Sequence, residues 1–244
     1  MSKYLFLALA LTLATTFFTR NRLQTVDRIR PETLAEPVQV ALAKPAVMTL
    51  TRNGYNYELT ALYDYTISGL VAHKLNYGWF VIDRSEKAFP VDLCLIWGDN
   101  LRQKLHQDRS VRFSQDCRFC FARWDGNVPF NAEQLSNNHL LAADDALETK
   151  LKQIRAGDQV TLHGKLVNVK ATLVGRGGRY DSTAMTWNTS TTRTDSGPGA
   201  CEVIYVEQAV VLQSANLLSR KLFWGSAAGL GGLLLWKIGR LFRP

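Results

Sequence analysis

The chain has 244 residues, of which 46% are hydrophobic and 20% are charged, with 17 glycines and 7 prolines. These values are typical of a folded protein of one or two domains and exclude a disordered or fibrous chain. Four cysteines are too few for a disulfide-dense mini-scaffold.

The formal net charge of +8 belongs mainly to the two ends of the chain. Residues 1–39 and 216–244 hold ten basic and three acidic residues, whereas residues 40–215 hold 19 basic and 18 acidic residues. A nucleic-acid-binding domain is expected to carry its basic surplus on a face of the folded body. The distribution therefore disfavours nucleic acid as a partner. Basic residues beside apolar segments favour lipid headgroups.

An uncharged apolar run occupies residues 4–18, between Lys3 and Arg20. A cleaved signal peptide has a similar run, but no small-residue cleavage site follows here and arginines come directly after it. Because long basic side chains can reach the membrane surface, the sequence predicts an uncleaved transmembrane anchor over residues 1–20. Residues 21–54 contain Pro31, Pro37 and Pro45 and little periodicity, which predicts an extended tether.

From residue 55 to about residue 214, apolar and polar residues alternate with period two. This pattern predicts a mainly β body. Only one helix is expected, beginning after Asp144 or Asp145 and ending before Gly157. Many short strands around one helix favour a small β-barrel or a sandwich. The expected strands are 55–62, 65–73, 91–97, 111–121 (broken), 159–169, 172–174 and 202–212.

The order of helix, Gly157-Asp158 and a strand with Gly164 at its centre resembles OB-fold barrels, in which a helix precedes the fourth strand. Gly164 favours a bulge or a sharp bend in that strand. The alternating polar positions of the strand include no aromatic residue, which nucleic-acid-binding OB faces usually have. The resemblance is therefore to the barrel geometry. A cytoplasm-facing, OB-like nucleic-acid binder stays as an alternative hypothesis.

The longest irregular stretch is residues 176–199, and a loop of this length is either mobile or functional. Its candidate functional residues are Arg193, Asp195, Gly197 and Gly199.

A second apolar segment lies in residues 215–244, which predicts a transmembrane helix with a basic tail. Trp224 and Trp236 stand near its two ends, where interfacial aromatic residues are found. Gly225 and Gly229 form a GxxxG pattern, which lets another helix pack closely. The alternative is that glycine is simply frequent in membrane helices. Four glycines would destabilise a helix in water by about 1 kcal/mol each.

The cysteines are Cys94, Cys117, Cys120 and Cys201, and disulfides among them are permitted in an oxidising compartment. The pair at 117 and 120 has C-x-x-C spacing, but it lies in a strand-like stretch and does not open a helix, which disfavours redox catalysis. A zinc site would need a second close pair, and the sequence has none. Which cysteines pair stays open.

A cysteine-dependent hydrolase is an alternative hypothesis, with Cys201 as nucleophile, His139 as base and Asp195 as the orienting carboxylate. The glycines of the loop could supply N–H donors for an oxyanion. Against it, any chain of this size contains some Cys, His and Asp. The competing interpretation places Cys201 at the start of a packed strand, with residues 193–195 fixing the loop, and His139 hydrogen-bonding backbone in a loop.

Several phrases of the sequence resemble a family of uncharacterised proteobacterial membrane-anchored proteins with a β-rich, OB-like body. They are residues 59–65 (LTALYDY), 92–98 (DLCLIWG), 136–140 (SNNHL) and 190–202 (STTRTDSGPGACE). The resemblance covers about residues 57–212 and implies an N-terminal anchor and a periplasmic body. It implies no activity. Members of that family usually lack a strong second span, and this chain departs from them there.

These observations together predict a membrane-anchored, β-rich binding or assembly module of the bacterial envelope, with an enzyme as the alternative. The expected location is the bacterial inner membrane, with the body in the periplasm. The expected partners are the lipid bilayer and another membrane or envelope protein, or a second copy of the chain through the C-terminal helix. No cofactor and no metal are expected.

Overall fold

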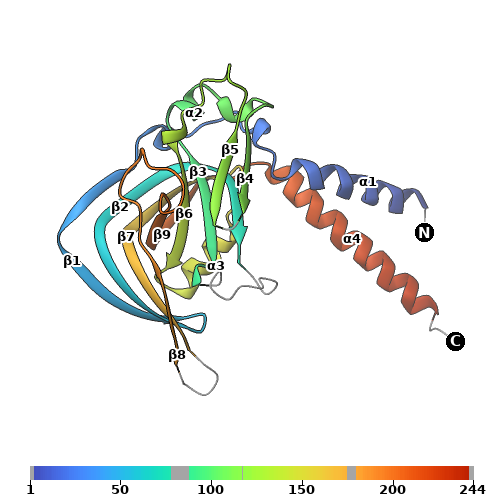
Figure 1. Cartoon of the computed structure of the whole chain (residues 1–244). Coiled ribbons are helices and arrows are strands. Elements are labelled where there is room, and N and C mark those ends of the chain that lie inside the picture. Colours follow the sequence, from blue (N-terminus) through green and yellow to red (C-terminus); the bar gives the residue numbers. More distant parts are fainter. Residues whose placement is uncertain (1–2, 78–87, 117, 175–179, 242–244) are drawn as a thin grey trace.

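The computed structural model describes residues 3–77, 88–116, 118–174 and 180–241 (Figure 1). The fold is mainly β. Its strands are β1 Val38–Arg52, β2 Tyr55–Asn76, β3 Val91–Ile96, β4 Arg112–Asp116, β5 Phe119–Arg123, β6 Leu135–Ala142, β7 Gln159–Val174, β8 Tyr180–Trp187 and β9 Glu202–Gln213. Its α-helices are α1 Lys3–Thr19, α2 Asp99–Arg102, α3 Asp145–Gln153 and α4 Leu217–Leu241.

Among the described residues, seven strands form one sheet in the order β1-β2-β3-β6-β9-β7-β8, while β4 and β5 form a separate hairpin. The long strand β2 also pairs with β7, so the pairings β2–β3–β6–β9–β7 return to β2. All neighbouring pairs are antiparallel except β6 and β9, which are parallel. The predicted small barrel or sandwich is corrected to one large, curled seven-stranded sheet, because β1 and β8 extend it beyond these five strands.

Two hydrophobic clusters lie on opposite faces of β6, as the period of two requires. Leu140 and Ala142 point into the larger cluster, which β2, β3, β7 and β9 surround. Leu147 and Leu151 of α3 also belong to this cluster. Leu141 points the other way, into a second cluster with Phe89. His139 lies on this second face, because it is two residues from Leu141.

The predicted helix is present as α3. The side chain of Asp144 accepts a hydrogen bond from the Leu147 amide at 2.7 Å, which is the expected N-cap. At the other end, Lys74 Nζ donates to the carbonyl oxygens of Leu151, Lys152 and Ile154. Gly157 follows with φ +89°, a backbone conformation that favours glycine.

The segment predicted as an extended tether packs on the body. Its residues 38–52 form the edge strand β1, which pairs with β2. Pro45 is tolerated there because it lies between Ala41 and Ala46, where the register shifts and no ladder bond is needed. The chain before β1 is held by the Gln159 side chain, which donates to Arg28 O at 2.8 Å and accepts from Arg30 N at 2.7 Å.

Helices α1 and α4 lie side by side and form a helical hairpin that projects from one side of the body (Figure 1). A Cβ added at Gly229 would lie 3.1 Å from Leu9 of α1, so this glycine permits the close approach of the two helices. A Cβ at Gly225 would have no atom within 4 Å. The hairpin is fixed to the body by Arg220, which donates to the Asp158 carboxylate at 2.7 Å and to Ala156 O at 2.9 Å.

The two predicted transmembrane helices are not supported. Within the described ranges, no helix is long and apolar enough to cross a membrane. Helix α1 has 17 residues, or about 26 Å at 1.5 Å per residue, and α4 contains four basic residues. The predicted inner-membrane location depended on these two spans, and it is not supported either.

Candidate functional site

Three neighbouring strands bring Asp92, His139 and Cys201 together. In the antiparallel pair β3–β6, Asp92 lies directly opposite His139. In the parallel pair β6–β9, Asn138 lies opposite Glu202. Cys201 therefore stands at the entrance to β9, beside Asn137. The long-range register of the sheet, and not any local motif, assembles the cluster.

The three side chains form a Cys–His–Asp arrangement. His139 Nδ1 lies 3.0 Å from Asp92 Oδ1, and the Cys201 sulfur lies close enough to the same imidazole to raise its pKa. Asp92 is fully buried, His139 is 5% exposed and Cys201 is half-buried. A thiol, a base and an orienting carboxylate in this order are the elements of nucleophilic catalysis.

The environment holds the His139 ring in its charged form. Burial lowers the pKa of His139, but the Asp92 carboxylate and the Cys201 sulfur outweigh this and raise it to about 9. An imidazolium ion next to a cysteine stabilises the thiolate, which is the reactive form of that side chain. The charged ring therefore supplies positive charge close to the Cys201 sulfur.

Further polar groups fix the Asp92 carboxylate. Tyr77 Oη donates to Asp92 Oδ2 at 2.8 Å, and Arg118 Nη1 lies 3.6 Å from Asp92 Oδ1. The Arg118 guanidinium also lies over the rings of Tyr77 and Phe89, at 4.4 and 5.1 Å from their centroids. Phe89 in turn packs against the His139 ring. These contacts explain how a carboxylate can be buried completely and still face an imidazole.

The Arg118 backbone and Asn137 lie beside the sulfur. Asn137 Nδ2 is 3.6 Å from Cys201 Sγ and donates to Arg118 O at 2.6 Å. Arg118 stands between β4 and β5, and the disulfide Cys94–Cys120 connects β5 to β3. The disulfide therefore keeps this turn over the site. The Asn137 amide is therefore a side-chain donor beside the sulfur, where an oxyanion on a Cys201 adduct would need one.

A cavity of about 430 Å³ opens beside Cys201. Its wall combines apolar side chains, Phe119 and Leu135, with the loop residues Arg193 and Asp195. A cavity of this size can hold a small acyl group and its leaving group. The sulfur is thus accessible from a pocket, while the base behind it is not.

The predicted functional loop borders this cavity but does not complete the triad. Asp195 accepts a hydrogen bond from Ser190 Oγ at 2.5 Å, and the carboxylate beside His139 is Asp92. Arg193 forms an ion pair with Glu202, whose pKa burial raises to about 7 although Arg193 opposes the shift. Gly197 and Gly199 have φ of +82° and +94°, and a Cβ on either would meet no atom within 4 Å. Their role is to turn the chain.

Cys201 and His139 are predicted as site residues from the sequence. Asp92, Asn137 and Arg118 are not. One signal was present: Asp92 is a lone carboxylate in an otherwise apolar strand, which buries it only with a partner. The position of the partner depends on strand register and could not be read from local spacing. Within the part of the chain that the structure describes, no group of three or more His, Cys, Asp or Glu side chains is placed to hold a metal ion.

Comparison of the chain with protein-family models, with curated proteins and with solved structures finds no match. The interpretation of the site depends on its geometry.

Proposed function

We propose that the protein is a cysteine-dependent acyl hydrolase or acyltransferase, with Cys201 as the nucleophile, His139 as the acid and base, and Asp92 as the orienting carboxylate. The observation that carries the proposal is the buried imidazole of His139, which lies 3.0 Å from the Asp92 carboxylate through Nδ1 and close enough to the Cys201 sulfur for that sulfur to raise its pKa. The cavity beside Cys201 supplies access for an ester or a thioester.

The proposed reaction has two steps. The Cys201 thiolate attacks the carbonyl carbon, the bond to the leaving group breaks, and the His139 imidazolium gives its proton to that group. Water, or an acceptor alcohol or amine, then attacks the thioester while His139 takes up its proton, and the C–S bond breaks. Asp92 keeps the ring oriented in both steps, and the Asn137 amide donates to the oxyanion.

A chromogenic ester tests the proposal. With p-nitrophenyl acetate we expect a burst of p-nitrophenolate and acetylation of Cys201, detected by mass spectrometry of the peptides. Cys201→Ser should lose at least about 10³-fold in acylation rate, whereas Ser114→Ala, which removes an exposed hydroxyl from β4, should acylate at the wild-type rate. Equal rates in wild type and Cys201→Ser, or acetylation elsewhere only, would contradict the proposal.

Alkylation separates a reactive pair from a merely half-buried thiol. Iodoacetamide should modify Cys201 at pH 7, and His139→Gln should slow this reaction at least about tenfold, because the imidazolium that stabilises the thiolate is lost. Circular dichroism checks that the variant is folded. An unchanged alkylation rate in folded His139→Gln would show that the two side chains do not act together.

A second candidate function is assembly with another copy of the chain through the helical hairpin. Large apolar side chains are exposed on both helices, among them Leu7 and Phe18 of α1 and Trp224 and Leu235 of α4. Exposed apolar surface of this kind marks interaction sites. Gly225 has no neighbour within 4 Å, so a helix of a second copy could approach there.

Sedimentation over a range of concentrations tests this assembly. We expect a reversible dimer or larger oligomer, and Gly225→Leu should weaken it at least about tenfold, which corresponds to about 1.4 kcal/mol. The matched control is Gly231→Leu, which is also open but lies on another face of α4. A monomer at all concentrations, or equal effects of the two variants, would contradict the hypothesis.

A further inference from the structure

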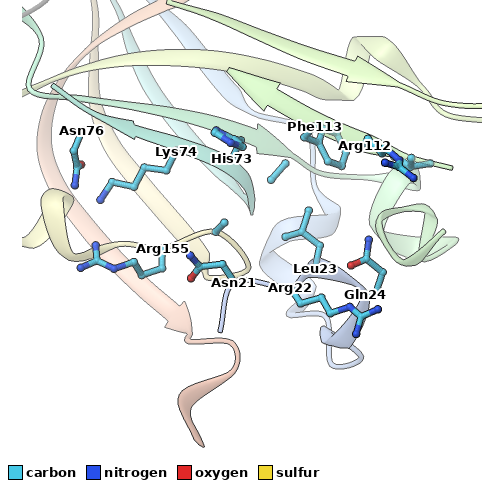
Figure 2. A pocket seen from close by; sticks show the side chains of 13 residues that line it. Asn21, Arg22, Leu23, Gln24, His73, Lys74, Asn76, Arg112, Phe113 and Arg155 are labelled. Atoms are coloured by element: carbon cyan, nitrogen blue, oxygen red, sulfur yellow. The ribbon is translucent and has the colours of Figure 1, made fainter. Parts of the chain in front are cut away.

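A second cavity lies where the helical hairpin joins the body. Its volume is about 650 Å³. Four segments contribute to its wall: residues 21–24 after α1, the end of β2 at residues 72–76, the start of β4 at residues 111–113, and the turn after α3 at residues 155–156 (Figure 2). The cavity lies away from Cys201, and none of its lining residues belongs to the proposed acyl-transfer site.

The lining is strongly basic. Arg22, Lys74, Arg112 and Arg155 line it, and no lining residue among the described ones carries a carboxylate. Figure 2 shows Arg155 on one side of the cavity and Arg22 and Arg112 on the other. No ion pair within the described ranges joins any of these three arginines to a carboxylate. Arg155 Nη1 donates to Lys152 O at 2.7 Å and to Ile154 O at 3.0 Å, which holds this guanidinium at the wall without neutralising its charge. The three positive charges can therefore attract an external anion.

The environment of Lys74 agrees with an excess of positive charge. Its ammonium group already donates to three carbonyl oxygens at the end of α3, so it is held at the wall of the cavity. Burial lowers the pKa of Lys74 to about 7, and the charges of Arg155 and Lys152 act in the same direction and outweigh the opposite effect of Asp158.

The wall also supplies neutral donors. The side-chain amides of Asn21 and Gln24 lie on it, beside Arg22. Guanidinium groups bind phosphate through two parallel N–H···O bonds, and amide donors complete such sites. The aromatic ring of Phe113 beside Arg112 leaves one wall apolar, which suits a ligand with an uncharged part next to its charged group.

We propose that this cavity binds a phosphate-bearing anion, with Arg22, Arg112 and Arg155 as its charged ligands. The same chemistry is present in an anionic phospholipid headgroup and in a soluble phosphate ester. The apolar residues exposed on the adjacent hairpin are compatible with the first source, and the hydrogen-bonding amides are compatible with both.

Binding measurements on the full chain distinguish these sources. The soluble probes are inorganic phosphate and pyrophosphate, titrated by calorimetry. The lipid probes are phosphatidylcholine vesicles with and without phosphatidylglycerol, tested by co-sedimentation. Binding of phosphate or pyrophosphate supports a soluble ligand. Binding that appears only on vesicles with phosphatidylglycerol supports a headgroup.

Charge-removal variants place the ligand in the cavity. Arg22→Gln combined with Arg112→Gln should weaken binding of the positive probe at least about tenfold, and because both side chains are exposed the variant should fold normally. The matched control is Arg123→Gln, which removes an exposed charge from β5 directly opposite Arg112 and outside the cavity. Absence of binding to every probe, or equal weakening by the control, would overturn the proposal. Both results are independent of Cys201 chemistry.

Discussion

Replacing Asp92 with asparagine is expected to slow acylation of Cys201 by about 10³- to 10⁴-fold, the scale seen when the orienting carboxylate of a triad is removed. Asparagine has nearly the same shape, but it carries no charge to hold the imidazolium. Without that charge, burial dominates, and the pKa of His139 should fall from about 9 to below its ordinary value of 6.5. The ring would then be neutral at pH 7 and could not stabilise the thiolate.

The rate of p-nitrophenolate release and an NMR titration of His139 measure the two effects separately. The matched control is Asp99→Asn, which removes a half-buried carboxylate at the start of α2 that pairs with Arg102, outside the site. A variant in which the pKa of His139 falls but acylation persists would show that the imidazolium is not required. An unchanged pKa would show that Asp92 does not face the ring in solution.

The contact between Asp92 and His139 also makes the stability of the folded chain depend on pH. The pKa of His139 is about 9 in the folded chain and 6.5 when the ring is free. Its contribution is fully present below pH 6.5 and is lost as the pH rises through 9, because the folded state then gives up the proton it holds more tightly. The wild-type chain should therefore lose stability between pH 6.5 and 9, and Asp92→Asn should not show this loss.

The elements that could be predicted from the sequence are those fixed by local chemistry. Helix α3 has an N-cap at Asp144 and a stop at Gly157, and both are found. Strand β6 was not predicted, because Ser136, Asn137 and Asn138 are typical of a loop. In the structure Asn138 is buried and its Nδ2 donates to Leu93 O at 3.1 Å, so a neighbouring strand satisfies the polar side chain that the sequence alone leaves unpaired.

The residues of the candidate site also fall into those that the local sequence predicts and those that depend on strand register. Cys201 and His139 could be proposed because a thiol and an imidazole are the side chains that nucleophilic catalysis needs, whereas the carboxylate, Asp92 in place of Asp195, depended on strand register. For the terminal segments, composition predicted too much. Apolar residues and basic flanks predicted two membrane spans, whereas in the structure the two helices pack against each other, with Thr19 Oγ1 donating to Ser219 Oγ at 3.3 Å. Composition alone does not report such a contact between residues 200 positions apart.

Gly164→Ala is expected to destabilise the chain by at least about 3 kcal/mol, which for a protein of ordinary stability is a large part of the total. A Cβ at this position would lie 2.0 Å from the carbonyl oxygen of Tyr205 and 3.0 Å from the Val206 Cα. These are backbone atoms of β9, so no side-chain rotation can relieve the clash. The register of β7 with β9 shifts between His163 and Gly164, which confirms the irregularity that the mid-strand glycine predicts.

Urea unfolding followed by tryptophan fluorescence measures the effect, with Gly126→Ala as the matched control. A Cβ at Gly126 meets no atom within 4 Å, so the control should change the free energy of unfolding by less than about 0.5 kcal/mol. The consequence extends to the site, because β9 begins at Glu202, next to Cys201, and pairs with β6 beside His139. Widening the β7–β9 pair by one methyl group should therefore also lower the alkylation rate of Cys201. Normal stability in Gly164→Ala would show that these two strands do not approach each other as closely as the fold requires.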